Sequence, residues 1–239
     1  MAGEAVWLVG GLDPSGGAGV LRDVATVRAL APSRPVHVVV TALTQQGDGQ
    51  PAAARVTEAN ALLEQLERAP TPAAIKLGLV PAALASLLVK HLPDAPRVVD
   101  PVLAASAGGA MGAEPAALRP LLRDALVTPN RSEARALLAG QAPDAWLEDV
   151  GALALLRKSV ASTEHSIVDV LHTPQGERRL ERPRVAGPDP RGTGCALATA
   201  IACGLARGAS MVGAVSAAVA WLDEARTGAR QVGPQVLLP

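Results

Sequence analysis

The sequence predicts an α/β fold in which a mainly parallel central sheet carries helices on both faces. Short apolar runs, several of them rich in β-branched residues, alternate with longer helix-favouring runs along most of the 239 residues, and this alternation is typical of βαβ units. Polar side chains stand where several apolar runs end, as ligand-binding residues do in such sheets. No linker, repeat or low-complexity tract divides the chain, so residues 1–239 are expected to form a single domain.

The expected strands are short apolar runs of the kind that a parallel sheet buries on both faces. They cover residues 5–10, 36–43, 73–77, 97–100 and 125–128. Residues 153–158 either form a further strand or are bypassed by the sheet, and the sequence leaves both possibilities open. Two more runs, 168–171 and 178–181, flank the turn signal at 173–176 and predict an antiparallel hairpin.

The expected helices lie between these strands and at the end of the chain. They cover residues 20–30, 57–68, 81–91, 114–123, 132–139, 195–207 and 211–226. Thr57 and its neighbours offer polar groups for the first turn of the second helix. Pro81 stands at an early position that tolerates proline, and Gly140 is placed to terminate the helix before it.

The composition excludes several classes of protein. The 22 Lys and Arg residues balance 22 Asp and Glu residues, which argues against a general surface for nucleic acids or acidic membranes. The chain has no Phe and no Tyr, so stacking on single-stranded bases is not supported either. No apolar run reaches the roughly 20 residues of a membrane helix. The first residues lack the basic segment of a signal peptide.

The two cysteines point to a reducing compartment. Cys195 and Cys203 are eight residues apart on one expected helix, which separates their Cα atoms by about 12 Å, too far for a disulfide. Free thiols favour the cytosol, so we expect a cytoplasmic protein.

Glycines at 192 and 194 precede the Ala-rich helix at 195–207. Glycine lets the backbone turn tightly, and the helix that follows presents unpaired amides and a partial positive charge at its start. Such a start suits an anion, above all a phosphoryl group, and would stabilise the thiolate of Cys195. The alternative is a turn that requires glycine beside a small buried cysteine.

Common enzyme motifs are absent from the sequence. There is no P-loop, no G-x-G-x-x-G after a strand and no G-x-S-x-G. The four histidines are dispersed and match no metal-binding spacing. Instead, Asp13, Gln46, Asp100 and Asn130 follow four of the expected strands, at the edge where open α/β sheets bind ligands.

Six short motifs in order resemble hydroxymethylpyrimidine/phosphomethylpyrimidine kinase, the thiamine-pathway branch of the ribokinase-like superfamily. They are DPSGGAG (13–19), TALTQQ (41–46), IKLG (75–78), DPV (100–102), TPN followed by Glu133, and GTGC (192–195). The resemblance implies a ribokinase-like three-layer α/β/α sandwich. It also implies transfer of a phosphoryl group from ATP, with Mg²⁺, to a hydroxymethylpyrimidine or its monophosphate, by a protein that is commonly a homodimer.

The resemblance also implies roles for individual residues. For the pyrimidine substrate it implies Gly11, Asp13, Ala18, Asp23, Gln46 and Val102. For the nucleotide it implies Asn130, Lys158 and Arg191, and for Mg²⁺ Asn130 and Glu133. For catalysis it implies the amides of Gly192, Thr193 and Gly194, with Cys195 as the base that accepts the alcohol proton.

Several of these residues have plain structural alternatives. Asp13 before Pro14 can form a turn, Gln46 can be an ordinary loop residue, and Asn130 with Glu133 can cap a helix. Lys158 can lie at a solvated helix end. An amide at position 46 nevertheless suits an aminopyrimidine, because it both donates and accepts, and oxygen ligands suit Mg²⁺.

The chain departs from the family pattern on the nucleotide side. A family segment with lysine, two glycines and histidine is replaced here by 155–161, in which Lys158 stands at the lysine position, and Arg191 stands where histidine is common. Two other functions therefore stay open. One is a non-catalytic, pyrimidine-binding relative, and the other is a pyridoxal-type kinase.

Overall fold

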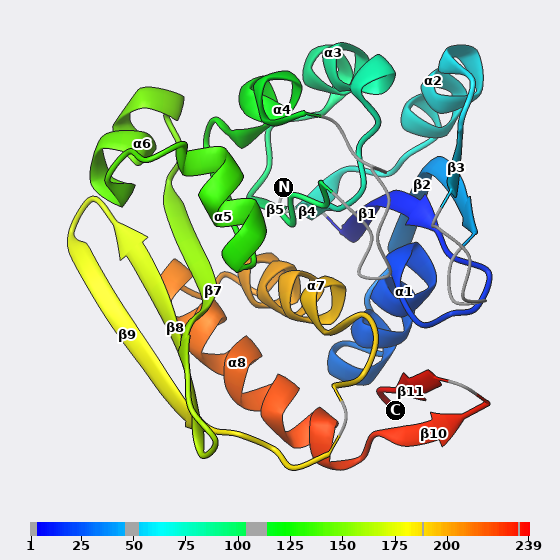
Figure 1. Ribbon diagram of the computed structural model, residues 1–239. Helices are drawn as coiled ribbons and strands as arrows, with labels where there is room; N and C mark the ends of the chain where they lie inside the picture. Colours follow the sequence, from blue (N-terminus) through cyan, green and yellow to red (C-terminus); the bar gives the residue numbers. More distant parts are fainter. Residues whose placement is uncertain (1–3, 46–52, 104–113, 188, 234) are drawn as a thin grey trace.

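The computed structural model describes residues 4–45, 53–103, 114–187, 189–233 and 235–239, which build a sheet between two layers of helices (Figure 1). The strands of this sheet are β1 (Ala5–Leu12), β2 (Val36–Gln45), β3 (Ala53–Val56), β4 (Pro72–Leu77), β5 (Arg97–Val99), β6 (Ala125–Val127), β7 (Ala154–Ser162), β8 (Ser166–Thr173) and β9 (Gly176–Pro183). Their order is β3-β2-β1-β4-β5-β6-β7-β8-β9. From β2 to β7 all neighbours are parallel, whereas β3, β8 and β9 run antiparallel to theirs. The predicted mainly parallel sheet is confirmed.

Helices cover both faces of the sheet. They are α1 (Gly19–Leu30), α2 (Ala59–Glu67), α3 (Ala82–His91), α4 (Pro115–Leu122), α5 (Arg131–Leu138), α6 (Pro143–Val150), α7 (Thr193–Ala206) and α8 (Met211–Thr227). Alternate residues of β1 point to opposite faces. Trp7 and Val9 pack into a core with α2 to α6, while Val6 and Leu8 pack into a second core with α1, α7 and α8. The three-layer α/β/α prediction is therefore confirmed.

The strand order reverses direction at β1, which pairs with β2 on one side and β4 on the other. In open α/β sheets, ligands bind beyond the carboxyl ends of the strands at such a switch point. The loops that follow β1, β4, β5 and β6 all emerge at this edge. The topology therefore brings the polar residues after these strands to one place.

The structure also differs from the prediction in several elements. Residues 154–162 form β7, which resolves the open question about this segment in favour of a strand. Three strands were not predicted: β3, β10 (Arg230–Val232) and β11 (Gln235–Leu237). All three are short, β3 and β10 are largely exposed and β11 is only half-buried, so they carry no buried apolar pattern. The second helix begins at Ala59, because the Thr57 hydroxyl donates to the carbonyl of Val40 instead of capping. None of the described helices combines the length and the apolar character needed to cross a bilayer.

Candidate active site

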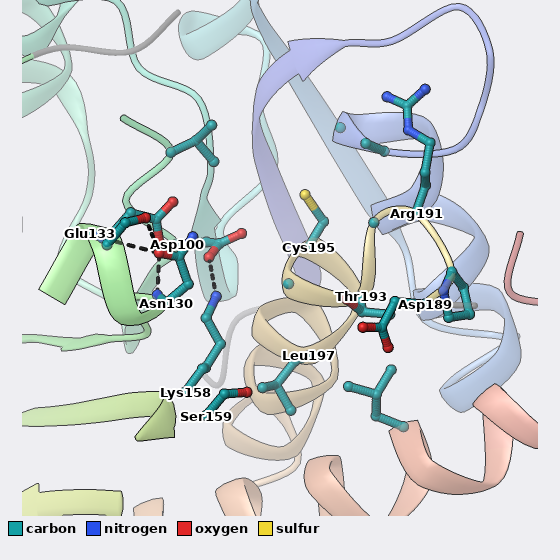
Figure 2. A pocket seen from close by; sticks show the side chains of 18 of the residues that line it. Asp100, Asn130, Glu133, Lys158, Ser159, Asp189, Arg191, Thr193, Cys195 and Leu197 are labelled. Carbon is teal, nitrogen blue, oxygen red and sulfur yellow. Dashed lines mark hydrogen bonds and ion pairs between the residues drawn. The ribbon is translucent and has the colours of Figure 1, made fainter. Parts of the chain in front are cut away.

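A cavity of about 950 Å³ opens at the edge of the sheet where the polar loops meet. Most of the residues predicted to act on a ligand line it: Gly11, Ala18, Val102, Asn130, Glu133, Lys158, Arg191, Gly192, Thr193, Gly194 and Cys195. Figure 2 shows Glu133, Asp100 and Lys158 on one side of it and Cys195 and Arg191 on the other. Gln46, predicted to bind the substrate, lies outside the described residues.

The start of α7 forms one wall of the cavity. Gly192 is the N-cap residue of α7, with a φ of +73°, and no side chain caps this end of the helix. A Cβ atom at Gly192 would lie 2.2 Å from the carbonyl oxygen of Gly17, so only glycine lets the two loops approach this closely. The first amides of the helix have no intrahelical partner. The wall therefore presents backbone donors and a positive helix end to the cavity.

Cys195 is partly exposed at this wall, in the first turn of α7. Burial raises the pKa of its thiol to about 11, with Lys76 acting against that shift and Asp23 and Asp100 adding to it. The helix start was expected to stabilise the thiolate. Burial and the two carboxylates instead favour the neutral form, so with a pKa of about 11 Cys195 is a thiol at neutral pH.

We expect the alkylation rate of Cys195 to follow this raised pKa. Only the thiolate reacts with iodoacetamide, so the rate should rise about tenfold per pH unit from pH 7 and level off only near pH 11. The measurement is modification by mass spectrometry across pH, with Cys195→Ser assigning the signal. Cys203, 1% exposed, should stay unmodified in the folded protein. An alkylation rate that levels off below pH 9 would contradict the raised pKa of Cys195.

The opposite wall carries a cluster of charged side chains. Lys158 Nζ lies 2.8 Å from Asp100 Oδ1, and the two side chains are 14% and 5% exposed. Although burial raises the pKa of Asp100, the ammonium groups of Lys158 and Lys76 hold it below its ordinary value. The same pairing raises the pKa of Lys158 against the effect of burial. Lys158 lies in β7, so the alternative of a solvated helix end is wrong.

Asn130 and Glu133 form a capping box at the start of α5. Asn130 Oδ1 accepts from the backbone N–H of Glu133 at 3.0 Å, and Glu133 Oε2 accepts from the backbone N–H of Asn130 at 2.8 Å. Burial, together with the neighbouring charge of Asp100, raises the pKa of Glu133 to about 7. The helix-capping alternative thus describes real contacts, while both residues still line the cavity.

The residues of this wall can take part in holding Mg²⁺. Among the described residues, the remaining oxygens, Glu133 Oε1 and Asp100 Oδ2, accept no hydrogen bond from the protein. Carboxylate oxygens with room for water suit Mg²⁺. Within the same part of the chain, no group of three His, Cys, Asp or Glu side chains could hold a metal by itself. The donor set therefore fits an ion that is completed by water and phosphate oxygens.

A buried ion pair lies beneath Cys195. Lys76 Nζ lies 2.7 Å from Asp23 Oδ2, with the side chains 1% and 0% exposed, and Thr199 Oγ1 donates to Asp23 Oδ1 at 2.8 Å. Although burial would lower the pKa of Lys76, the Asp23 carboxylate raises it, so the ammonium is retained. Lys76 lines the cavity, but Asp23 does not. Both oxygens of Asp23 are thus engaged in the core, outside the cavity lining, and its role in substrate binding stays a prediction.

Asp13 is also turned away from the cavity. It is 1% exposed, its Oδ1 accepts from the backbone N–H of Ser15 at 3.0 Å, and its carbonyl accepts from Gly16. The turn-forming alternative therefore describes its contacts, and its role in substrate binding stays a prediction. Its Oδ2 pairs with Arg191 Nη2 at 3.2 Å, which links the first glycine loop to the last.

Lys76 and Asp100 are among the cavity residues that received no role from the sequence. Lys76 had a signal, because it is a lone charge inside an otherwise apolar strand. Asp100 was noted as a polar residue at the end of a strand, but its pairing with Lys158 joins residues 58 positions apart. A pattern of neighbouring residues cannot predict a contact between residues so far apart in the sequence.

A sequence model of the phosphomethylpyrimidine kinase family matches residues 13–238 of the chain. The hydroxymethylpyrimidine/phosphomethylpyrimidine kinase of Rhizobium meliloti is 33% identical over 239 residues, which cover 91% of this chain and 88% of that protein. The thiamine biosynthesis multifunctional protein ThiED of Corynebacterium efficiens is 30% identical over 96% of this chain. The chain spans 33% of that relative's length and 46% of the length of a bifunctional one.

Solved structures show the same fold. The pyridoxal kinase from Staphylococcus aureus in complex with AMP-PCP and pyridoxal superposes with a TM-score of 0.85 at 25% identity. The match covers 100% of this chain and 94% of that one. The long similarity extends through β7 to β9, the region where the motifs depart from the family pattern.

Proposed function

Because the chain belongs to the phosphomethylpyrimidine kinase family, we propose that it transfers the γ-phosphoryl group of ATP to 4-amino-5-hydroxymethyl-2-methylpyrimidine, to its monophosphate, or to both. The family match confirms the resemblance carried by the six motifs and the ribokinase-like fold that it implied. It favours a kinase in thiamine biosynthesis over the sensor and over pyridoxal as the preferred substrate.

One observation supports phosphoryl transfer most directly. The Nζ atom of Lys158 lies 3.2 Å from the position that a Cβ atom at Gly194 would occupy. A side-chain ammonium and the amides of a helix start therefore converge on the same part of the cavity. Phosphoryl transfer needs little besides positioning and neutralisation of charge on the moving group. We assign Lys158 and Arg191 to the nucleotide phosphates, and the amides of 192–195 to the transferred phosphoryl group.

Across the cavity, the remaining residues have distinct tasks. The substrate hydroxymethyl group would lie beside Cys195, which is a thiol in the free protein at neutral pH and would act as a base only in its thiolate form. That thiolate would accept the hydroxyl proton as the new oxygen–phosphorus bond forms and the bond between the γ-phosphorus and the leaving oxygen of ADP breaks. Gly11, Ala18 and Val102 would line the space for the pyrimidine ring. Glu133, Asp100 and Asn130 would hold Mg²⁺ through water, and the ion would neutralise phosphate charge. Gln46 is proposed to bind the ring, as the sequence predicted.

The assay that tests the proposal is ADP release in the presence of ATP and Mg²⁺. We expect turnover with hydroxymethylpyrimidine or its monophosphate, loss of turnover with EDTA, and slower turnover with pyridoxal. Cys195→Ala should reduce turnover at least about tenfold while ATP still binds, because proton transfer is lost. Binding of the pyrimidine without ADP release would favour the sensor. Faster turnover of pyridoxal than of the pyrimidine would favour the pyridoxal-type kinase.

The remaining predictions concern organisation. We propose that residues 1–239 act as a single domain, in the cytoplasm and as a homodimer, as the sequence predicted. Light scattering coupled to size-exclusion chromatography measures the assembly directly.

A further inference from the structure

The C-terminal hairpin, formed by β10 and β11, is separate from the main sheet and was not predicted from the sequence. Figure 1 shows it beside α1 and the segment that leads into α7. The proposed reaction gives it no part. Its contacts nevertheless lead to both glycine-rich loops of the candidate active site.

The first contact is with the loop between β1 and α1. A Cβ atom at Gly17 would lie 2.9 Å from Gln235 Oε1 and 3.1 Å from Leu237 Cδ2. Glycine at this position thus allows β11 to pack directly against the loop. Ala18, the next residue, lines the cavity.

The second contact is with the segment that enters the anion-binding wall. The backbone N–H of Arg191 donates to the carbonyl of Val236 at 2.9 Å, and Arg191 pairs with Leu237 as an isolated parallel bridge. The next residue, Gly192, closely approaches the carbonyl of Gly17. Three segments therefore meet at one junction: the hairpin, the loop that contains Gly17 and the turn that contains Gly192.

Arg22 fastens the end of this hairpin to α1. It is 6% exposed, and its Nη1 and Nη2 donate to the carbonyls of Pro239 and Leu238 at 3.0 and 3.1 Å. Its Cγ atom lies 3.1 Å from the position of a Cβ at Gly192. Leu238 is buried in the core with α1, α7 and α8. One side chain thus contacts the hairpin end and the first residue of the anion-binding turn.

We propose that the C-terminal hairpin, held by Arg22, is a positioning element for phosphoryl transfer that fixes the amides at the start of α7. This proposal rests on the proposed kinase function. Backbone donors are effective only when they are held in place before the reaction, and a displacement of about 1 Å can cost about 100-fold in rate. Arg22 touches no cavity space, so it is a positioning residue and not a catalytic one.

The test compares Arg22→Met with Arg28→Met. Arg28 is a matched control, because it lies on the same helix and also donates to two backbone carbonyls, those of Pro32 and Arg34, away from the cavity. We expect Arg22→Met to lower kcat at least about tenfold with the KM for the pyrimidine changed less than about threefold. Arg28→Met should keep the wild-type kcat. Arg22→Lys, which can still donate to one carbonyl, should recover part of the loss.

A second measurement does not depend on kinase activity. Iodoacetamide should modify Cys195 at least about threefold faster in Arg22→Met than in Arg28→Met, because a loosened turn exposes the thiol. Equal kcat and equal alkylation rates in the two variants would overturn the proposal. If Arg22→Met fails to fold, Leu238→Ala replaces it, and its kcat and its rate of Cys195 alkylation are compared with those of Arg28→Met. If the wild-type protein releases no ADP, the kinase function fails, while alkylation still reports on the hairpin.

Discussion

Replacing Lys76 with methionine should destabilise the protein by about 3–5 kcal/mol, the usual cost of breaking a buried ion pair. The Asp23 carboxylate, 0% exposed, would keep its bond from Thr199 but lose its counter-charge. Burial raises the pKa of Asp23, so in the variant the folded state would hold its proton to a higher pH than the unfolded state does. The destabilisation should therefore grow as the pH rises above about 4, the unfolded value. Urea unfolding at pH 5 and pH 8 measures both effects.

The double variant Lys76→Met with Asp23→Leu is the matched control. Replacement of both charged groups by apolar ones is often close to neutral, so it should recover at least about half of the lost stability. Recovery with a flat pH dependence would identify the unpaired carboxylate as the cause. Equal destabilisation of the single and double variants would show that shape, not charge, sets the cost.

The second large effect is expected from Gly192→Ala. The new methyl group would lie 2.2 Å from the carbonyl oxygen of Gly17, and φ is +73. Backbone must move to relieve a contact this short, which would shift the amides of 193–195. We expect kcat/KM to fall at least about 100-fold in the ADP-release assay.

Gly208→Ala supplies the control for this variant. Gly208 follows the other end of α7 and has a similar φ of +80, but a Cβ there would have no neighbour within 4 Å. It should cost only the conformational strain, about 1–2 kcal/mol, and leave kcat/KM close to wild type. Similar losses of activity in both variants would contradict a specific role for the junction between Gly17 and Gly192.

Much of the fold was predictable because it depends on local patterns. Apolar runs such as those of β1 and β4 are buried on both faces and can be read without knowledge of their neighbours. The hairpin of β8 and β9 was predicted from its turn signal. Strands β3, β10 and β11 escaped prediction, because exposed short strands exist only through pairing with a partner that the local sequence does not name.

The candidate site was predictable to a similar degree. Glycine-rich turns and the Asn130–Glu133 spacing are local signals, and these residues line the cavity. Whether a side chain points into the cavity or into the protein core does not depend on its sequence neighbours alone. Asp13 and Asp23 carry the right chemistry in the right loop and helix, yet both turn into the protein, where Arg191 and Lys76 meet them.

The sequence by itself determined the alternation of strands and helices, the family, and the glycine turns that a phosphate site needs, because each depends on residues within a few positions of one another. Only the tertiary structure decided which charges meet. Lys76 with Asp23, Lys158 with Asp100 and Arg22 with the C-terminal hairpin join segments 53, 58 and about 216 residues apart. Such pairs depend on how the sheet and helices pack, and the same packing sets the raised pKa of Cys195.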